Sequence, residues 1–305
     1  MPTKQFDLSI IIPVYNEEEV LPLLFKRLKK LFTKLKKESI NTQLIFVNDG
    51  SADKSLEPLR QFANTVEIPT TVINFTRNFG HQSALLAGYS LAKGTYHATI
   101  DADLQDPPEL ILDMYKKAVK HKKKVILAKR ISRQEPGILK ELTAKIYYKM
   151  LKKLTQIPIE EEVADFRLIH KDVTTQLLQI RSVPRFLRGE ISYLGYPYTI
   201  VKYKRHARQA GKTKYSLKKM ITLAMIGILS FSDVLPHILM LGTLFVALLA
   251  IVFIYLNFVS LLYVLIFMYI MVTLLLLLIY LQKIFFLLSN KPDYVIQDII
   301  TNYGD

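Results

Sequence analysis

The longest uncharged stretch of the chain constrains its fold more than any other feature. Residues Val234 to Gln282 contain no Asp, Glu, Lys or Arg over 49 consecutive positions. That length is too great for one membrane-spanning helix and suits two helices of roughly 20 residues each. We therefore predict one span near Leu235–Leu256 and a second near Leu261–Gln282, joined by a short turn at 257–260. The alternative is a buried hairpin in a soluble core, although such helices usually keep a polar edge.

Charge is concentrated before the uncharged stretch. Residues 1–232 hold 39 of the 41 Lys and Arg and 22 of the 26 Asp and Glu, which makes this part +17. Basic residues crowd positions 202–219, and Lys283 and Lys291 follow the second predicted span. Because basic flanks mark the cytoplasmic side, we expect both termini in the cytoplasm and two spans in the inner or plasma membrane. Nucleic acid is not an expected partner, since base-reading folds do not carry such an uncharged stretch.

Two segments beside the hairpin, itself assigned to residues 233–283, are predicted to lie at the membrane surface. Apolar residues recur at helical spacing through 216–232 with Lys218 and Lys219 beside them, which is typical of an amphipathic interfacial helix. An ordinary core helix is the alternative. Residues 284–305 are predicted to form a C-terminal interfacial segment interrupted by Pro292. Residues 1–215 then remain as a separate domain.

The first 130 residues alternate apolar runs with helical patterns. The runs are Leu8–Val14, Gln43–Val47, Thr70–Asn74, Tyr96–Ile100 and Val125–Ala128, and the predicted helices are Glu18–Lys37, Ser55–Phe62, His81–Ala92 and Pro107–Lys120. This alternation predicts an α/β domain with a Rossmann-like, mostly parallel sheet covered by helices on both faces. Ligands bind at the carboxyl ends of strands in such sheets, so the residues that follow each run are site candidates.

Polar side chains follow four of these runs. They are Tyr15, Asn16 and Glu17 after the first run, Asn48 and Asp49 after the second, Arg77 and Asn78 after the third, and Asp101, Asp103 and Gln105 after the fourth. No Gly-x-Gly-x-x-Gly follows the first run and no Gly-x-x-x-x-Gly-Lys-Ser/Thr occurs, which argues against dinucleotide and P-loop sites. We expect these side chains to share one crevice.

Asp101-x-Asp103 at a strand end suits a divalent cation that bridges phosphate oxygens. Mg²⁺ and Mn²⁺ prefer oxygen ligands, and Gln105 offers a further amide oxygen. Such a pair is more often a solvated turn, but its place at a strand end favours the metal. Arg77 and Arg130 can neutralise phosphate charge through bidentate contacts, although a lone surface Arg is usually solvated.

Asn48 and Asp49 can exchange hydrogen bonds with the edge of a nucleobase. Alternatively they belong to a Gly-containing turn that caps the next helix, with Ser51 or Asp53 as the cap. Tyr15 can stack on a base or be an ordinary half-buried tyrosine.

Together these motifs resemble the GT-A fold, family 2 glycosyltransferases, and more narrowly the polyprenyl-phosphate glycosyltransferases that act on dolichyl or undecaprenyl phosphate. The resemblance rests on Pro13–Glu18, Val47–Ser51, Arg77–Gly80 and Asp101–Gln105, and it continues through Asp165–Leu168, Arg185–Gly189, Arg208–Tyr215 and Lys291–Tyr294. It covers nearly the whole chain. It implies a GT-A catalytic domain in residues 1–215, a hexosyltransferase activity and a homo-oligomer such as a tetramer.

The resemblance also assigns the donor site. Its nucleotide-contacting loop matches Pro13, Tyr15 and Glu17, and its base-recognising pair matches Asn48 and Asp49, where many members have Asp in place of Asn48. Its sugar-nucleotide and metal pair matches Asp101 and Asp103, with Ala102 between them and Gln105 as a further ligand of Mg²⁺ or Mn²⁺.

Other residues are assigned to the acceptor and to the leaving group. The resemblance places Arg130 near the acceptor phosphate, with Lys140 as a second candidate, and it implies that Arg208 and Lys214 hold the donor pyrophosphate. Asp165 is the best candidate for a base or acceptor-orienting carboxylate, and structural pairing with Arg167 is the alternative. We interpret His81 as a helix-start residue and not as a catalyst.

The implied reaction moves a sugar from a nucleotide sugar, UDP-hexose or UDP-N-acetylhexosamine, to undecaprenyl phosphate at the cytoplasmic leaflet. It depends on a metal and inverts the anomeric centre. The lipid phosphate is already anionic, so a strong base is not required.

Four alternatives belong to other classes or donors. A mannose synthase would use GDP-mannose with dolichyl or polyprenyl phosphate, and a scaffold would bind sugar nucleotides without catalysis. A processive polysaccharide synthase is disfavoured because its Trp-containing motif cannot occur in a chain without Trp. A flippase is disfavoured because two short spans enclose little pathway.

Overall fold

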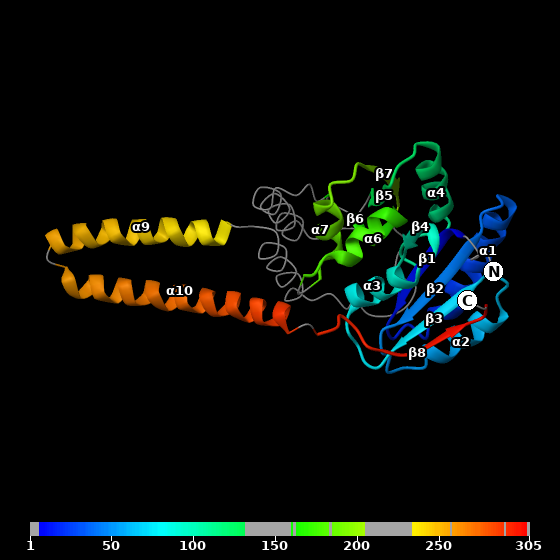
Figure 1. The fold of residues 1–305 in the computed structure, drawn as a ribbon, viewed down its shortest axis with the longest axis horizontal. Helices are drawn as coiled ribbons and strands as arrows, with labels where there is room; N and C mark the ends of the chain where they lie inside the picture. The colour runs from blue at the N-terminus through cyan, green and yellow to red at the C-terminus, as the bar shows by residue number, and fades with distance from the viewer. Residues whose placement is uncertain are drawn as a thin grey trace.

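The described residues form an α/β domain and a pair of long helices (Figure 1). The computed structural model describes residues 6–131, 160, 163–182, 185–204, 234–256, 258–289 and 291–303. The predicted amphipathic helix at 216–232 lies outside these residues.

Within the described residues, eight strands form one sheet in the order β7-β5-β6-β4-β1-β2-β3-β8. They are β1 (Phe6–Val14), β2 (Thr42–Asn48), β3 (Thr70–Phe75), β4 (Gly94–Thr99), β5 (Val125–Arg130), β6 (Val163–His170), β7 (Tyr198–Tyr203) and β8 (Ile296–Thr301). Parallel pairs join β1 with β2 and β4, β2 with β3, and β5 with β7. Strand β6 is antiparallel to both β4 and β5, and β8 is antiparallel to β3. The predicted α/β class and the parallel core are confirmed.

Helices cover both faces of the sheet. One face packs against α1 (Leu21–Lys37), α2 (Leu56–Thr65) and α4 (Leu110–Lys120), and the other against α3 (His81–Leu91), α6 (Lys171–Gln179) and α7 (Leu187–Tyr193). Alternation along β1 feeds both cores, since Ile10 and Ile12 lie in the first and Ile11 in the second. The strand ends therefore project beyond two well-packed layers.

Two predicted helices begin later than the sequence indicated. The helix predicted from Glu18 starts at Leu21, and the helix predicted from Pro107 starts at Leu110. The backbone N–H of Glu18 instead donates to Asp53 Oδ2 at 3.1 Å. The start of the predicted helix is thus part of the loop that follows β1.

The predicted C-terminal interfacial segment is wrong. Residues up to Leu288 continue α10 (Val259–Leu288), and Ile296–Thr301 forms β8 at the sheet edge. Beyond β8, Asn302 Nδ2 donates to the carbonyl of Ala63 at 2.7 Å, which fixes the strand against α2. Burial along β8 alternates with a period of two, with Ile296, Asp298 and Ile300 on the half-buried side, as in an edge strand.

Helices α9 (Val234–Tyr255) and α10 form the predicted hairpin, with α10 beginning two residues earlier than the predicted span. Among the described residues, the segment Val259–Gln282 is long and apolar enough to cross a membrane, and only 6% of its most apolar window is buried. The apolar part of α9, Leu239–Tyr255, is shorter. This exposure contradicts the soluble-core alternative and matches an apolar environment such as a membrane.

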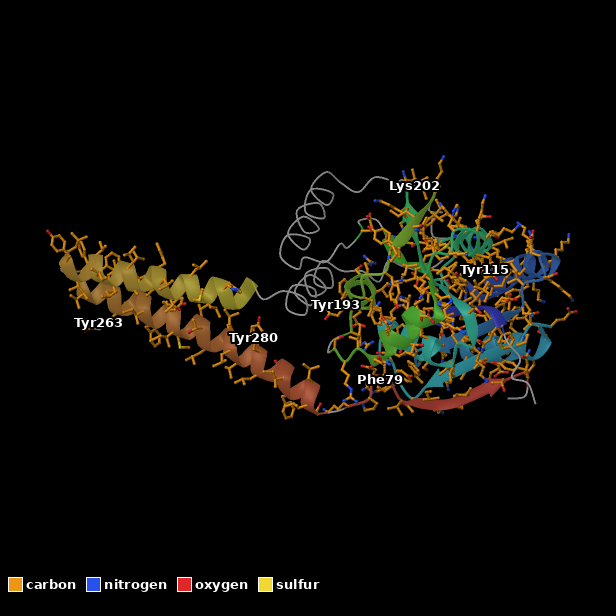
Figure 2. The ribbon with its side chains drawn as sticks, turned by 45° about the horizontal axis from the view of Figure 1, so that its top comes forward. Phe79, Tyr115, Tyr193, Lys202, Tyr263 and Tyr280 are labelled. Carbon is orange, nitrogen blue, oxygen red and sulfur yellow. The ribbon has the colours of Figure 1, made fainter. Side chains whose placement is uncertain are left out.

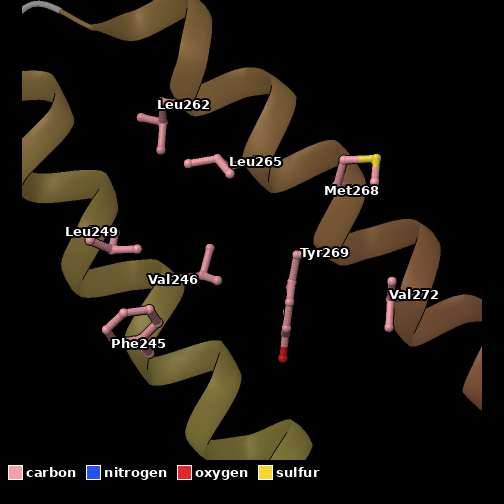
Figure 3. Close-up of a pocket in the computed structure, with 8 residues that line it drawn as sticks. All are labelled: Phe245, Val246, Leu249, Leu262, Leu265, Met268, Tyr269 and Val272. Atoms are coloured by element: carbon pink, nitrogen blue, oxygen red, sulfur yellow. The ribbon is translucent and has the colours of Figure 1, made fainter.

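Tyr269 joins the two helices. Its hydroxyl donates to the carbonyl of Leu239 at 2.7 Å and lies 2.7 Å from Thr243 Oγ1, so it packs inside the hairpin. Tyr263 lies near the hairpin tip, where its side chain is exposed (Figure 2). Tyr269 also lines an apolar groove of about 320 Å³ between the helices (Figure 3). The groove lining holds no carboxylate, imidazole or cationic side chain, so the chemistry lies elsewhere.

Candidate active site

The loop after β1 is joined to the loop after β2 by hydrogen bonds. Asn16 has a positive φ of 53°, its N–H donates to Ser51 Oγ at 3.0 Å, and its Oδ1 accepts from the N–H of Ala52 at 2.8 Å. The N–H of Glu17 donates to Ser55 Oγ at 2.9 Å. Pro13 is buried at the end of β1, whereas Tyr15 is 37% exposed. The loop thus presents the Tyr15 ring to solvent, as stacking on a ligand requires.

Gly50 brings the loops after β2 and β3 into contact. Its φ is +59°, and a Cβ at this position would lie 2.2 Å from the carbonyl carbon of Arg77. Only glycine accommodates both the left-handed backbone and this close approach. The Asn48-Asp49-Gly50 turn is therefore packed directly on the turn that follows β3.

Asp49 holds the loop after β3. The carboxylate is 3% exposed and accepts from the N–H of Phe79 at 2.7 Å, the N–H of Gly80 at 3.0 Å and Nδ2 of Asn78 at 2.9 Å. Burial raises the pKa of Asp49, and the two backbone N–H groups oppose this shift. Asp49 therefore braces two loops, a role that neither the base-edge nor the helix-cap hypothesis included.

Both polar atoms of the Asn48 side chain form hydrogen bonds to neighbouring side chains. Its Nδ2 donates to Asn74 Oδ1 at 2.8 Å, and its Oδ1 accepts from Ser51 Oγ at 2.6 Å. Asn74 is a buried residue of β3, and Ser51 lies in the loop after β2. The predicted contact of Asn48 and Asp49 with a nucleobase stays a prediction.

Acidic side chains follow β4, as predicted. Asp101 is about one-third exposed, with a side-chain exposure of 31%. Desolvation raises the pKa of Asp101 to about 6, the carboxylates of Asp103, Asp106 and Asp165 add to the shift, and His81 opposes it. Such a concentration of negative charge favours binding of a cation.

The residues fit a divalent metal that is shared with a phosphate ligand. Asp103 is nearly buried and its Oδ1 accepts from the N–H of Gln105 at 3.1 Å, while Ala102 packs its methyl group into the core. No group of three or more His, Cys, Asp or Glu side chains in the described residues is placed to hold a metal alone. Mg²⁺ commonly takes one or two carboxylates and completes its shell with phosphate oxygens and water, which matches Asp101 and Asp103.

Strand β6 brings Asp165 to the crevice. The antiparallel register pairs Thr99 with Arg167, so Asp165 lies beyond the end of β4, on the side of Asp101. Asp165 contacts the guanidinium of Arg167, which is 2% exposed, and accepts from Gln82 Nε2 at 3.3 Å. Although burial raises the pKa of Asp165, Arg167 and His81 outweigh it and hold the pKa well below its usual range. The pairing with Arg167 is confirmed, and it makes Asp165 a very weak base.

His81 begins α3, as predicted, and also bridges two carboxylates. Its Nε2 lies 3.5 Å from Asp101 Oδ1 and 3.3 Å from Asp165 Oδ2. Desolvation lowers the pKa of His81, but Asp101 and Asp165 outweigh it and raise the pKa to about 9. This cation was not predicted from the sequence, in which its one signal was the place of His81 directly after Arg77-Asn78-Phe79-Gly80.

Arg130 ends β5 beside the acidic turn. Its Nη2 lies 3.6 Å from Asp106 Oδ2, its Nε donates to the hydroxyl of Tyr203 at 3.2 Å, and that hydroxyl donates to Asp106 Oδ1 at 2.5 Å. Desolvation lowers the pKa of Arg130, but Asp106 outweighs it and raises the pKa above its usual value. The structure therefore brings Arg130 to the same acidic turn as Asp101 and Asp103.

The other predicted basic residues are not placed beside the acidic turn by the described contacts. Arg77 is exposed, and its guanidinium lies 4.1 Å from the centre of the Phe79 ring, which Figure 2 labels. Lys140, Arg208 and Lys214 lie outside the described residues. Their roles at the phosphates stay predictions.

The fold is of the class of α/β protein in which ligands bind at the carboxyl ends of parallel strands, and here those ends carry Asp101 and Asp103. The profile of Glycosyl transferase family 2 matches residues 9–178, and the chain belongs to this family. The resemblance in the sequence is confirmed, and the protein is a glycosyltransferase.

Named relatives share most of their length with this chain. An uncharacterized glycosyltransferase, YkcC of Bacillus subtilis (strain 168), is 42% identical over 230 residues, which cover 75% of this chain and 70% of the relative. The prophage bactoprenol glucosyl transferase homolog of Escherichia coli (strain K12) is 39% identical over 226 residues, covering 74% and 72%. The bactoprenol glucosyl transferase of Shigella phage SfV is 38% identical over 226 residues, covering 74% and 72%.

Two solved structures match this chain at low identity. Staphylococcus aureus TarS matches with a TM-score of 0.46 and 16% identity over 65% of this chain and 59% of that chain. Glucosyl-3-phosphoglycerate synthase from Mycobacterium tuberculosis, in complex with Mn²⁺, UDP and glucosyl-3-phosphoglycerate, matches with a TM-score of 0.49 and 14% identity over 72% and 76%.

Proposed function

We propose that this protein transfers a hexosyl group from a UDP-sugar to undecaprenyl phosphate at the cytoplasmic face of a membrane, with a divalent metal and with inversion. Two relatives are named bactoprenol glucosyl transferases, which supports a lipid acceptor and glucose as the first sugar to test. The proposal rests on one observation. The same chain has an acidic site, which favours binding of a cation, and an exposed apolar hairpin.

The donor occupies the crevice at the ends of β1 to β4 in this proposal. Tyr15 stacks on the base, and the loop carrying Pro13 and Glu17 follows the nucleotide. Asp101 and Asp103, with Gln105 as a further ligand, would hold Mg²⁺ or Mn²⁺, which neutralises charge on the departing diphosphate. Arg208 and Lys214 add cationic contacts to the same leaving group. The family resemblance supports these roles, and for Asp101 and Asp103 the acidic surroundings described above support them as well.

The acceptor approaches from the side of β5 and β6. Arg130 faces the acidic turn with its charge partly balanced by Asp106, and it would contact the lipid phosphate together with Lys140. A phosphate monoester is anionic at neutral pH, so the reaction does not need the carboxylate of Asp165 as a base. Asp165 acts instead by holding His81, the protonated imidazole between the two carboxylates.

The hairpin keeps the crevice near the lipid. In the proposed topology α9 and α10 both span the membrane, the two termini and the catalytic domain lie in the cytoplasm, and the 216–232 segment lies on the inner leaflet. Basic residues at 202–219 would add attraction to anionic lipid. A homo-oligomer such as a tetramer completes the proposal.

Transfer assays with the purified full chain test the function. The donors are UDP-glucose, UDP-N-acetylglucosamine, UDP-galactose and GDP-mannose, each with undecaprenyl or dolichyl phosphate, in Mg²⁺, in Mn²⁺ and in chelator. We expect a glycosylated undecaprenyl phosphate from a UDP-sugar and none in chelator. Transfer from GDP-mannose alone would identify a mannose synthase, and no transfer with any pair would refute the proposal.

A further inference from the structure

Three strands place polar residues side by side at one corner of the sheet. Asn48 of β2 is the register partner of Asn74 in β3, and Asn74 is the register partner of Asp298 in β8. Asn48 and Asn74 are buried, at 2% and 4% exposure. Because β8 follows the helical hairpin in the chain, the row unites the start of the domain with its last strand.

Hydrogen bonds run along this row without a break. Asn74 Nδ2 donates to Asp298 Oδ2 at 3.1 Å, with Gln297 Oε1 as a longer acceptor at 3.4 Å. Asn48 Nδ2 donates to Asn74 Oδ1 at 2.8 Å, and Ser51 Oγ donates to Asn48 Oδ1 at 2.6 Å. The N–H of Asn16 then donates to Ser51 Oγ at 3.0 Å. The row therefore ends on the loop that carries Tyr15.

The carboxylate at one end dictates the direction of every bond in the row. A carboxylate accepts only, whereas an amide group can turn over and exchange its donor for its acceptor. Asp298 therefore requires Asn74 to point Nδ2 toward β8 and Oδ1 toward Asn48. Asn48 must then donate to Asn74 and accept from Ser51, which leaves Ser51 Oγ free to accept from the backbone of Asn16.

We infer that Asp298 is a positioning residue for the nucleotide of the donor, acting through Asn74, Asn48 and Ser51 on the loop that carries Tyr15. The inference rests on the proposed function, because it takes the loops after β1 and β2 as the nucleotide site. It adds a role for the strand beyond the hairpin, which none of the donor motifs contains. Buried polar networks with a fixed direction specify one arrangement of their members.

Arg60 supplies a matched control. Its Nη2 lies 3.3 Å from Asp298 Oδ1 and 3.4 Å from Oδ2, and both side chains are about one-third exposed. Exposed ion pairs contribute little to stability. Arg60→Gln thus removes the second partner of Asp298 and leaves the row from Asp298 to Asn16 in place.

Titration of UDP in Mg²⁺ into the detergent-solubilised full chain measures the effect. Asp298→Leu, which removes the acceptor at similar volume, should weaken UDP binding by about tenfold, because two amides lose their fixed direction. Asp298→Asn retains one acceptor oxygen and should recover most of the affinity, and Arg60→Gln should bind like the wild type. In Asp298→Leu, the kcat at saturating donor should change less than KM.

Ser51→Ala supplies the second test, from the other end of the row. If the row acts as a unit, Ser51→Ala and Asp298→Leu together weaken UDP binding by less than the product of their separate effects. Wild-type affinity in a folded Asp298→Leu chain, or multiplicative effects in the double variant, would overturn the inference alone. Absence of UDP binding by the wild type would overturn the proposed function as well.

Discussion

The two halves of the crevice are built from different interactions. The half formed by the loops after β1, β2 and β3 is held by amide, hydroxyl and backbone hydrogen bonds that converge on Asn16, Asn48 and Asp49. The half at the end of β4 and the start of β6 is held by charges, with His81 between Asp101 and Asp165. We call the first the neutral half, because neutral donors make its hydrogen bonds, and these bonds fix the shape of the loops. We call the second the charged half, because its carboxylates carry negative charge that a bound cation or a proton can neutralise.

Removing a carboxylate from the charged half has the largest expected effect. We expect Asp103→Ala to lower metal-dependent kcat by on the order of 10²–10³-fold, because the leaving diphosphate loses electrostatic stabilisation. Initial rates over a Mn²⁺ titration measure the loss. Asp113→Ala, at an exposed position of α4, is the control and should keep wild-type rates. Unchanged turnover in Asp103→Ala would remove this residue from the metal site.

The neutral half has its own most sensitive residue, but there the loss is in stability. Asp49→Asn deprives the N–H groups of Phe79 and Gly80 of the carboxylate to which both now donate, and should cost about 2–3 kcal/mol because the site is buried. Thermal unfolding of the purified protein measures this. Asp7→Asn affects an exposed acceptor of the Asn41 N–H and should cost less than about 1 kcal/mol. Equal losses in the two variants would contradict the brace assigned to Asp49.

Much of both halves could be predicted because it depends on local pattern. Apolar runs located β1 to β5, and the polar residues after four of them located Tyr15, Asn48, Arg77 and Asp101 at one edge of the sheet. The parallel order follows from the alternation of strands and helices. None of this required contacts between distant segments.

The contacts that join the halves to the rest of the domain could not be predicted. Strand β6 enters antiparallel between β4 and β5, and β8 returns from beyond the hairpin to pair with β3. Periodicity indicates that a segment is a strand, but it does not specify the partner. The bridge from His81 to Asp165 and the contact of Asp298 with Asn74 both depend on such pairings.

The charged half should also respond to pH between 6.5 and 9. The pKa of His81 rises from its ordinary 6.5 to about 9 in the folded protein. Its contribution to stability is therefore fully present below pH 6.5 and is lost as the pH rises through 9. We expect the melting temperature to fall by a few degrees over that range, and His81→Gln to abolish most of the fall.

His97 provides the opposite sign for comparison. Its Nε2 faces the carbonyl of Gly94 at 2.8 Å and its Nδ1 faces Thr174 Oγ1 at 2.8 Å, and burial lowers the pKa of His97 to about 4. Stability linked to His97 is thus lost as the pH falls from 6.5 toward 4. If the melting temperatures of wild type and His81→Gln change equally with pH from 6.5 to 9, the bridge from His81 to Asp101 and Asp165 does not stabilise the fold.

The smallest expected effect on activity comes from Arg77, a charged residue in the loop after β3, which belongs to the neutral half. Its guanidinium stacks on Phe79 in an exposed loop, where salt screens its attraction for a phosphate. Arg77→Gln should therefore raise the donor KM by about threefold at low ionic strength, with a smaller difference in salt, and should leave the melting temperature unchanged. Steady-state kinetics at two salt concentrations decide this. A loss of kcat in Arg77→Gln comparable with that of Asp103→Ala would mean that charged side chains of both halves act on the reacting groups. The two halves would then not differ in the way proposed here.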